Sequence, residues 1–449
     1  MKKAIISVSV ILILAFSLIG TIDRTPLKST EEYKKTFLNV AETIKELEQQ
    51  VSTDDTLQIG WAKECIIPKG VPLPVAGYGF RTQYRAVRDS LYARAFAFDD
   101  GIRQTYVLSL DLMIFPTEVR KRLGKKLLNI GITEEDVLFS ATHTHNGMGG
   151  FDPSLLGNVA MGIFSEEGTS KIVASAYQAI LNAKASKKKG SVGFLKTQSP
   201  EWVTNRIVYN GRKENSIRGI KINRVDGKNA AIVTYNAHPT HINMNYWILS
   251  RDYPGEWINH LEASKTIDFA AFCAGMVASH GPGDPKHIED SFERIKDMGS
   301  VLSDSILHIW DKTQTNAVVN VDIHKIPIDF RPSQIRIESN LKVRDWVFKS
   351  ASDGGLQGDI TLMRIGNIDW FACPSDFSGE IALDYQFDRV AHQQNKEFMV
   401  TSFNGNYAGY ITCDAYYDSL NSYEIREMNW VGPEYGAYFG EIIKELLEN

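Results

Sequence analysis

The stretch Val137-Leu-Phe-Ser-Ala-Thr-His143-Thr-His145-Asn-Gly-Met-Gly-Gly150 joins an apolar run to two histidines and several glycines. The apolar run predicts a strand over residues 136–145. Side chains alternate between the two faces of a strand, so His143 and His145 are expected on one face. Imidazole is the commonest metal-binding side chain, and two on one face form half of a zinc site. A pair of surface histidines at a strand end is the alternative interpretation.

A second histidine cluster lies at Val233-Thr-Tyr-Asn-Ala-His238-Pro-Thr-His241, again behind an apolar run. Proline fixes its own φ and ends the hydrogen-bond ladder of a strand, so His238 is expected at a rigid strand end. A catalytic zinc usually takes three protein ligands and one water. Two histidine-bearing strand ends in one chain therefore favour a metal site over unrelated structural histidines.

Segments with strand and helix patterns alternate around these two motifs. Strands are predicted at residues 91–99, 104–115 and 398–412, hairpins at 219–238 and 361–373, and helices at 117–131, 169–187, 292–310 and 435–447. The hairpin turns are expected at Asp226-Gly227 and Gly366-Asn367. This alternation predicts the α/β (α+β) class, with mixed β-sheets sandwiched by helices.

The composition excludes several classes of protein. Hydrophobic residues make up 43% and charged residues 23% of the 449 residues, which excludes disorder, a coiled coil and a polytopic membrane protein. The formal net charge is -5, so no basic excess is available to neutralise nucleic-acid phosphates. The four cysteines are Cys65, Cys273, Cys373 and Cys413. They are scattered without a CxxC pair, which argues against a disulfide framework.

Lys2 and Lys3 precede an uncharged segment that runs from Ala4 to Ile22. At about 1.5 Å per residue, a helix of this length spans roughly 28 Å, close to the thickness of a hydrocarbon core. A cleaved signal peptide is the alternative, but the segment ends without a small-residue cleavage site. We therefore expect residues 1–26 to be a signal anchor, with the rest of the chain in the periplasm or at the cell exterior.

Residues 27–56 are predicted to form an amphipathic helix, at about residues 31–51, and a short polar linker. A helix packed on the main domain and a free stalk both fit this pattern. From residue 57 to residue 449 no further linker or repeat is found. We interpret residues 57–449 as a single large domain.

The sequences ATHTHNGMGG and NAHPTHINMN resemble those of the neutral/alkaline ceramidase family, zinc amidases that hydrolyse the N-acyl bond of ceramide. Further segments match in the same order: Gly77-Tyr-Gly79, Asn205-Arg206, Cys373-Pro-Ser-Asp376-Phe, Asn404-Gly-Asn-Tyr-Ala-Gly-Tyr410-Ile-Thr and Ser422-Tyr423-Glu424. The resemblance covers about residues 77–424, the catalytic N-terminal domain of the family. The chain resembles a divergent member without the C-terminal immunoglobulin-like domain.

The resemblance implies roles for residues that match the family motifs. The implied zinc ligands are His143, His238, Asp376 and Tyr410. The residues implied to line the pocket and contact the scissile amide or the product carboxylate are His145, Arg206 and Tyr423. The family has glutamate at the position of Asp376, and the shorter aspartate still offers oxygen ligands. Without the resemblance, Arg206 suggests a surface ion pair and Tyr423 a packed aromatic side chain.

One departure from the family concerns a serine, in a Gly-Asp-Val-Ser-Pro segment, that has been assigned to the active site. An alignment without gaps places Ser279 at the aspartate and Gly281 at the serine. We therefore expect attack by zinc-activated water, because zinc lowers the pKa of its bound water to about 7.

The sequence thus predicts a membrane-anchored zinc hydrolase that cleaves the N-acyl amide bond of a ceramide-like lipid. The alternatives are a zinc amidase or esterase for another acylated substrate, and an inactive lipid- or glycan-binding relative. The acyl length, the head group and the oligomeric state stay open.

Overall fold

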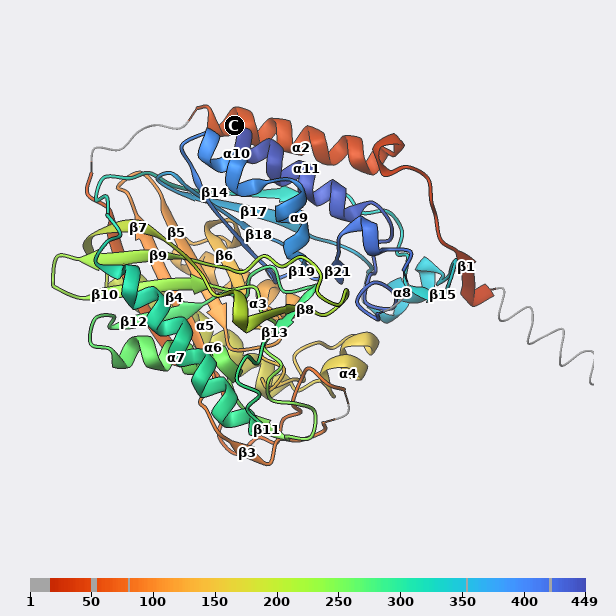
Figure 1. Ribbon diagram of the computed structural model, residues 1–449, viewed down its shortest axis with the longest axis horizontal. Coiled ribbons are helices and arrows are strands. Elements are labelled where there is room, and N and C mark those ends of the chain that lie inside the picture. The colour runs from red at the N-terminus through yellow and green to blue at the C-terminus, as the bar shows by residue number, and fades with distance from the viewer. Residues whose placement is uncertain (1–16, 50–54, 80, 353, 420–421) are drawn as a thin grey trace, which may run out of the picture.

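Two β-sheets stack face to face at the centre of the molecule, and helices cover the outer face of each (Figure 1). The structure is a computed structural model that describes residues 17–49, 55–79, 81–352, 354–419 and 422–449. The layers follow the order helix, sheet, sheet, helix. This arrangement confirms the predicted α/β class with several mixed sheets.

Within the described residues, the larger sheet has eight strands in the order β12-β10-β9-β7-β2-β4-β5-β6. Its parallel pairs, β5 with β6 and β10 with β12, lie at the two ends of this order. The strands are β2 (Gln58–Cys65), β4 (Tyr92–Asp99), β5 (Gln104–Leu110), β6 (Val137–Ala141), β7 (Lys188–Gln198), β9 (Ser216–Arg224), β10 (Asn229–Thr234) and β12 (Phe269–Phe272).

The smaller sheet follows the order β14-β17-β18-β20. Its strands are β14 (Val321–Pro327), β17 (Asp359–Ile365), β18 (Ile368–Ala372) and β20 (Glu397–Thr401). The pair β17 and β18 is antiparallel, whereas β18 and β20 run parallel. The carboxyl ends of β18 and β20 therefore lie side by side.

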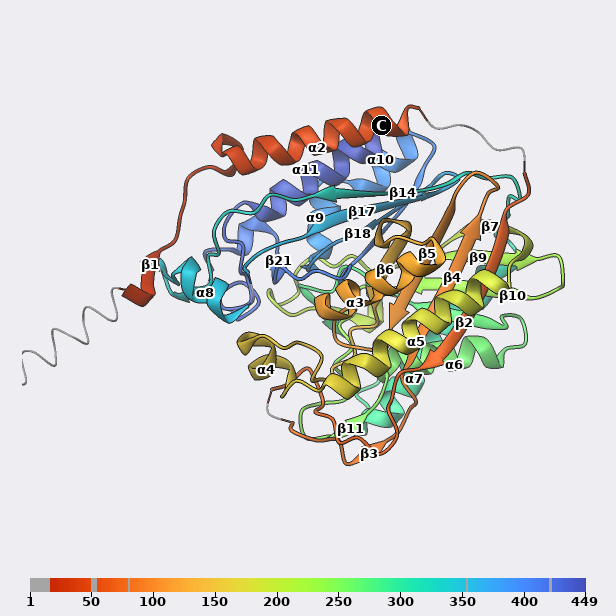
Figure 2. The same ribbon diagram turned by 180° about the vertical axis from the view of Figure 1, so that it is seen from behind.

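Helices on the two outer faces complete the layers (Figure 2). The larger sheet is covered by α3 (Thr117–Leu127), α5 (Glu166–Ala185), α6 (Asp252–Ala263) and α7 (Ser291–Trp310). The smaller sheet is covered by α2 (Glu31–Leu47), α9 (Gly379–Asp384), α10 (Phe387–Gln393) and α11 (Tyr435–Glu448). The short elements are β1 (Ile19–Thr21), β3 (Ala86–Val87), β8 (Val203–Asn205), β11 (Ile248–Leu249), β13 (His280–Pro282), β15 (Arg336–Glu338), β16 (Leu341–Val343), β19 (Asp376–Phe377), β21 (Tyr410–Ile411), α4 (Leu155–Met161) and α8 (Asp345–Ala351).

The sequence of β4 shows why the larger sheet is buried on both faces. Ala93, Ala95 and Ala97 belong to the core under the helices, and the small side chains let those helices approach closely. Phe96 and Phe98 point the other way, into the core shared with the smaller sheet. Full burial of a phenylalanine contributes about 2–3 kcal/mol. The alternation of small and large residues therefore fixes which face meets the second sheet.

The larger sheet curls until its two ends meet at their carboxyl-terminal edge. The Ala274 amide, just after β12, donates to the Ala141 carbonyl at the end of β6 over 3.0 Å. The Ser402 amide, just after β20, donates to the Ala274 carbonyl over 2.9 Å. Segments that leave β6, β12 and β20 are thus joined at one place, which we call the seam.

Local structure departs from the sequence prediction at three of the predicted strands. The strand expected over residues 104–115 ends at Leu110. The strand expected over residues 136–145 ends at Ala141, because His143 adopts φ 60° and turns the chain. The strand expected over residues 398–412 is divided into β20 and β21, since Phe403 and Gly405 both have positive φ. Both predicted hairpins are present.

The expected N-terminal anchor lies mostly in residues 1–16, outside the described residues. Its last part does not continue as a helix: β1 pairs antiparallel with β16, with Gly20 opposite Lys342. The helix expected through Ile22 therefore ends before Ile19, where the backbone joins a sheet. Of the helices that the structure describes, none combines the length and the apolar character needed to cross a bilayer.

Helix α2 packs on the main body of the protein and is therefore not a free stalk, the other arrangement that its sequence allowed. Val40 and Leu47 are buried against the core of the smaller sheet. The Asn39 side chain donates to the Pro327 carbonyl over 3.0 Å.

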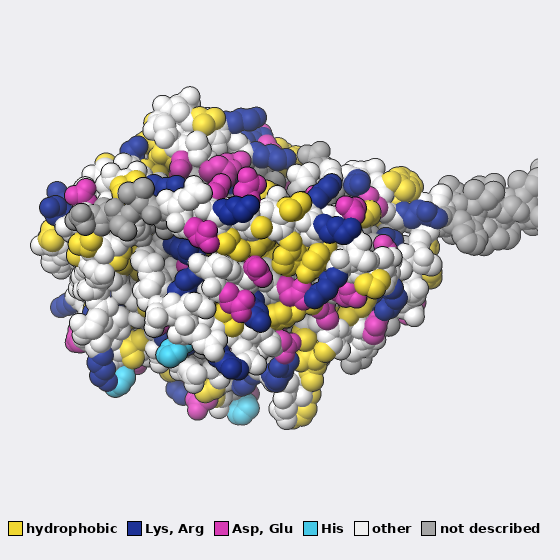
Figure 3. All heavy atoms as spheres, turned by 90° about the horizontal axis from the view of Figure 1, so that it is seen from above, with side chains coloured by type: hydrophobic (Ala, Val, Ile, Leu, Met, Phe, Trp, Pro, Cys, Tyr) yellow, Lys and Arg dark blue, Asp and Glu magenta, His cyan; other side chains and the backbone are white. Residues whose placement is uncertain are grey.

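Seen from above, basic and acidic side chains are interspersed on the face that carries α2, without a continuous basic stripe (Figure 3). The polar linker expected after the helix lies largely outside the described residues.

Candidate metal centre

Three histidine side chains converge at the seam. The Nε2 atoms of His143 and His238 lie 2.8 Å apart, those of His145 and His238 2.9 Å apart, and those of His143 and His145 3.3 Å apart. All three side chains are buried. The sequence motifs that suggested a metal site thus meet at one point, although β6 and β10 lie near opposite ends of the larger sheet.

The second ring nitrogen of each histidine contacts a backbone carbonyl. The Nδ1 atoms of His143, His145 and His238 lie 2.5, 3.0 and 3.2 Å from the carbonyl oxygens of Met113, Gly77 and Val277. A carbonyl oxygen only accepts, so each Nδ1 carries the proton and each neutral ring has a bare Nε2. The three Nε2 lone pairs therefore face one another, and a cation between them removes their mutual repulsion.

Burial keeps these imidazoles in the neutral form. It lowers the pKa of His145 to about 3, and the nearby Arg206 acts in the same direction. Burial also lowers the pKa values of His143 and His238 well below the ordinary value of 6.5. Neutral imidazole is the form that binds a metal ion, so the rings do not have to lose a proton first.

A carboxylate joins the three rings. Asp376 is fully buried, and its Oδ1 lies 3.3 Å from His143 Nε2 without a hydrogen-bond donor of its own. Its Oδ2 accepts a hydrogen bond from the Tyr407 hydroxyl over 2.7 Å. Burial raises the pKa of Asp376 to about 7. A buried oxygen without a donor is a ligand position that a cation satisfies.

The spacing of these donor atoms fits a zinc ion. Zinc–nitrogen bonds of about 2.0–2.1 Å place two ligand nitrogens about 2.8–3.4 Å apart at right or tetrahedral angles. The observed separations of 2.8–3.3 Å match this range. Three imidazoles and one carboxylate also form a donor set that suits zinc.

Strained backbone and close packing hold the histidines in place. His143 has φ 60° and Phe403 has φ 68°, and their rings stack at 4.2 Å. Non-glycine residues in this region cost on the order of 1–3 kcal/mol, and such strain is common at functional sites. Gly77 has φ 109° and leaves less than 3 Å between its missing Cβ and His145. Any larger residue at this position would collide with His145.

Tyr410 and Arg206 lie next to the carboxylate. Tyr410 pairs with Asp376 across the strands β21 and β19. Arg206 Nη2 donates to the Tyr410 hydroxyl over 3.3 Å, and Arg206 Nη1 pairs with Glu424 at 3.3 Å. Burial of the Tyr410 hydroxyl raises its pKa well above 10. The structure therefore brings the predicted residues Asp376, Tyr410 and Arg206 into one cluster with the histidines.

The remaining predicted positions lie around this cluster. Tyr423 is 57% exposed, and its neighbour Glu424, rather than Tyr423 itself, forms the ion pair with Arg206. Gly281 lies in β13, where an added Cβ would be 3.3 Å from Thr204 Oγ1 and 3.8 Å from Arg206. Ser279 is fully buried, and its hydroxyl donates to Glu380. The departure from the family serine therefore lies beside Arg206.

Sequence reasoning assigned no role to Tyr407, Glu424 or Phe403. Tyr407 belongs to the quoted Asn-Gly-Asn-Tyr-Ala-Gly-Tyr stretch, so its place in a motif was a usable signal. Glu424 directly follows Tyr423 in another quoted motif. Phe403 lies outside the motifs, and only the folded chain shows its stacking on His143.

A largely apolar cavity of about 340 Å³ lies beside the metal ligands. Its walls include Gly77, Met113 and Tyr407, each of which bonds to a member of the cluster. Its apolar lining comes from several elements: Ile114, Phe151, Leu156, Met161, Phe348 and Trp430. The fold and the site thus define an α/β protein with a candidate metal centre next to an apolar binding cavity.

Comparison with known proteins assigns this architecture to a family. The family model of neutral/alkaline non-lysosomal ceramidase, N-terminal, matches residues 57–282, just over half of the chain. The protein therefore belongs to the neutral/alkaline non-lysosomal ceramidase family. Neutral ceramidase A of Dictyostelium discoideum is 26% identical over 245 residues, which cover 49% of this chain and 34% of the relative. Neutral ceramidase B of the same organism is 26% identical over 256 residues, or 51% and 35%.

Solved structures share the fold. Neutral ceramidase from Pseudomonas aeruginosa superposes with a TM-score of 0.79 at 17% identity, covering 88% of this chain and 74% of that one. A ceramidase complexed with C2 superposes with a TM-score of 0.75 at 16% identity, covering 88% and 75%. The chain spans about a third of the length of the two Dictyostelium relatives.

Proposed function

We propose that the protein is a zinc-dependent hydrolase that cleaves the N-acyl amide bond of a ceramide-like lipid. The observation that carries this proposal is the convergence of three proton-free imidazole nitrogens and the Asp376 carboxylate beside an apolar cavity. A cavity of about 340 Å³ has the size of a small-ligand site, and its lining suits an alkyl chain. Family membership supports the amide as the bond that is cleaved.

Each side chain has a part in the proposed reaction. His143, His145, His238 and Asp376, with Tyr410 beside them, would hold a zinc ion, which would supply Lewis acidity and an activated water. Tyr407 holds Asp376 through a hydrogen bond of 2.7 Å, which fixes the orientation of the carboxylate. Arg206 keeps its charge when buried, because Tyr410 and Glu424 raise its pKa.

The positive charge of Arg206 can stabilise the amide oxygen of the substrate, which becomes negative during hydrolysis. Its guanidinium donates to the Ala278 carbonyl over 3.0 and 2.8 Å, so it is oriented before a substrate binds. An oriented cation in a buried site stabilises the developing oxyanion or the product carboxylate. Tyr423 is proposed to contact the same part of the substrate from the surface.

The surroundings of Ser279 support water rather than serine as the attacking group. The Ser279 hydroxyl donates to the buried Glu380 carboxyl, and the Ser378 hydroxyl donates to Ser279 over 2.6 Å. The side chain has no exposed surface. A substrate carbonyl thus has no direct approach to this oxygen.

We also propose that the protein works at a membrane, outside the cytoplasm. Helix α4 lines the cavity with Leu156 and Met161, yet it exposes Leu155 and Val159 by 66% and 52%. A helix that is apolar on both faces is matched by a lipid surface. The uncharged residues 4–16 lead into Ser17, whose carbonyl accepts a hydrogen bond from Trp346 of α8. Helix α8 also contributes Phe348 to the cavity.

The first experiment measures zinc and hydrolysis in the full-length protein. We expect about one zinc per chain by mass spectrometry and cleavage of N-acylsphingosine, both lost in His143→Ala. His308→Ala is the matched control, because His308 is exposed on α7 and lies outside the cluster. Protein that holds no zinc would contradict the proposal and favour an inactive lipid-binding relative.

A substrate panel separates the two enzyme interpretations. N-acylsphingosines of several acyl lengths are compared with N-acyl amino acids and acyl esters, at equal concentration and with the same zinc-loaded protein. We expect the sphingolipid amides to give the highest kcat/KM. A preference for acyl amino acids or esters would instead assign the protein to another acylated substrate.

Binding to vesicles tests the membrane surface. The double variant Leu155→Glu, Val159→Glu should bind phosphatidylcholine vesicles at least about tenfold more weakly, because two charges must leave water. Val225→Glu is the control, since Val225 is also exposed but lies at the β9–β10 turn. An equal loss of binding in both variants would contradict the proposal. If the wild-type protein is a dimer and the double variant is a monomer, the exposed face of α4 instead binds a second copy of the chain.

A further inference from the structure

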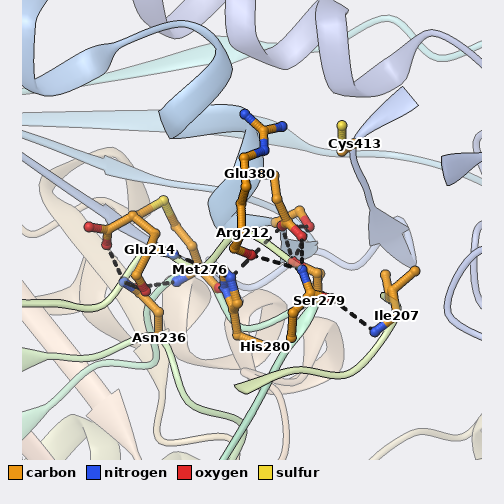
Figure 4. Close-up of polar contacts among 12 residues, drawn as sticks. Ile207, Arg212, Glu214, Asn236, Met276, Ser279, His280, Glu380 and Cys413 are labelled. Atoms are coloured by element: carbon orange, nitrogen blue, oxygen red, sulfur yellow. Dashed lines mark hydrogen bonds and ion pairs between the residues drawn. The ribbon is translucent and has the colours of Figure 1, made fainter. Parts of the chain in front are cut away.

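A buried carboxyl group, Glu380, lies behind the proposed site and has no part in the mechanism above. Its side chain is fully buried at the start of α9 (Figure 4). Oε1 accepts from Asn205 Nδ2 over 2.6 Å. Oε2 accepts from Ser279 Oγ, and Ser378 Oγ, which has one proton to donate, lies 3.0 Å from Oε2 and 2.6 Å from Ser279 Oγ. One carboxyl group thus contacts side chains from three separate segments of the chain.

Two of these segments are the immediate neighbours of Arg206. The Arg206 amide donates to the Ser279 carbonyl over 2.9 Å, and its guanidinium donates to the Ala278 carbonyl. Asn205 Oδ1 accepts from the amides of Ile207 and Val208, which turns the chain directly after Arg206. Two of the segments that orient Arg206, at Asn205 and at Ala278–Ser279, are therefore bonded to Glu380.

The third segment carries the metal-facing carboxylate. Asp376, Ser378 and Glu380 follow one another along β19 and the start of α9. The Ala278 amide also donates to the Phe377 carbonyl over 3.0 Å. Hydrogen bonds thus link the segment of Asp376 and Glu380 to the Ala278–Ser279 segment beside Arg206.

We propose that Glu380 is a positioning residue that holds the Arg206 guanidinium at a fixed place relative to the metal centre. The proposal rests on the proposed function, because it takes Arg206 to contact the reacting amide or its product. Glu380 itself acts through Arg206 and stays away from the substrate. A displacement of about 1 Å in such a group lowers a rate by up to about a hundredfold.

The hydrogen-bond pattern predicts which substitution preserves the position. Asn205 uses its Oδ1 for two backbone amides, and its Nδ2 donates to Glu380 Oε1 and to the Arg212 carbonyl. A glutamine can offer its oxygen to Asn205 and its amide group to the serine hydroxyls, which rotate to accept. Glu380→Gln should therefore keep the position of Arg206. Glu380→Ala removes the acceptor that Asn205 and Ser279 share and should release Arg206.

A double-mutant cycle tests the proposal in the zinc-loaded, full-length protein. Glu380→Ala should lower kcat on the order of tenfold to a hundredfold with zinc retained, and Glu380→Gln should stay within about threefold of wild type. In the Arg206→Ala background, Glu380→Ala should change kcat by less than about twofold, since nothing is left to position. An equal loss in both backgrounds would overturn the proposal.

A control and a second readout separate this proposal from the function itself. Glu262→Ala removes the half-buried partner of the buried Arg94, outside the cluster, so it should lower stability without lowering kcat. Laurate, a fatty-acid probe, is titrated calorimetrically into the four proteins of the cycle: wild type, Glu380→Ala, Arg206→Ala and the double variant. Weaker laurate binding in Glu380→Ala but not on top of Arg206→Ala supports the positioning role even if no amide is hydrolysed. Additive losses in laurate binding would refute it.

Discussion

Replacing Gly77 by alanine probes the metal site without removing a ligand. An alanine Cβ at this position would lie 2.6 Å from the Cα and Cβ atoms of His145 and 2.8 Å from its Cγ. Carbon atoms in contact are normally about 3.5–4.0 Å apart, so His145 must shift by about 1 Å. The positive φ costs about 1–2 kcal/mol and the overpacking about 1–3 kcal/mol. Together they amount to about 2–5 kcal/mol.

The assay is a competition titration of zinc against a chelator, with thermal unfolding measured on the same samples. If the strain is relieved by moving His145, zinc affinity falls about tenfold to a hundredfold, the loss expected for a disturbed ligand. Gly79→Ala is the matched control, because Gly79 also has positive φ but nothing lies within 4 Å of an added Cβ. His145→Ala gives the full effect of losing the ring. Equal zinc affinity in Gly77→Ala and Gly79→Ala would refute the reasoning.

Three further predictions concern other parts of the molecule. Ser279→Ala should keep kcat within about threefold, since Glu380 retains two donors, and an inactive variant that still holds zinc would revive a serine nucleophile. All four cysteines are free, and burial raises the pKa of Cys273 and Cys413 to about 12, so native alkylation at pH 8 should label Cys65 alone, as mass spectrometry can check. Burial raises the pKa of Asp252 from 3.8 to about 6, so the folded state holds more protons in that window and the free energy of unfolding should fall by up to about 3 kcal/mol as the pH rises through it. Asp252→Asn should flatten this slope in denaturant titrations, and an unchanged slope would contradict the assignment.

Local patterns in the sequence predicted most of the regular elements. The hairpin turns at Asp226-Gly227 and Gly366-Asn367 were predicted because glycine accepts the positive φ, which is 79° at Gly227 and 61° at Gly366. The helix α7 begins and ends within one residue of the predicted bounds, since its apolar period is clear. The class of the fold follows from the alternation of such elements.

The site was predicted from motifs rather than from geometry. His143 and His145 are close together because His143 leaves the strand, which a two-residue period does not foresee. Asp376 and Tyr410 adjoin through the pairing of two short strands, and only the long-range fold creates that pairing. The contacts of Glu380 join three distant segments, and no local pattern marks a residue whose partners are so remote.

The seam has a thermodynamic consequence for the whole chain. The candidate ligands follow β6 and β10, near the two ends of the larger sheet, and β18 of the smaller sheet, so no fragment that lacks either sheet contains the whole set. Contacts of such high sequence separation form late, because loop closure must come first. A metal ion that binds only the closed chain stabilises it by about 1.4 kcal/mol for every tenfold rise in free metal above its Kd. With a metal at this site, occupancy would report the completion of folding, and depletion of the metal would lower the unfolding temperature of both sheets together.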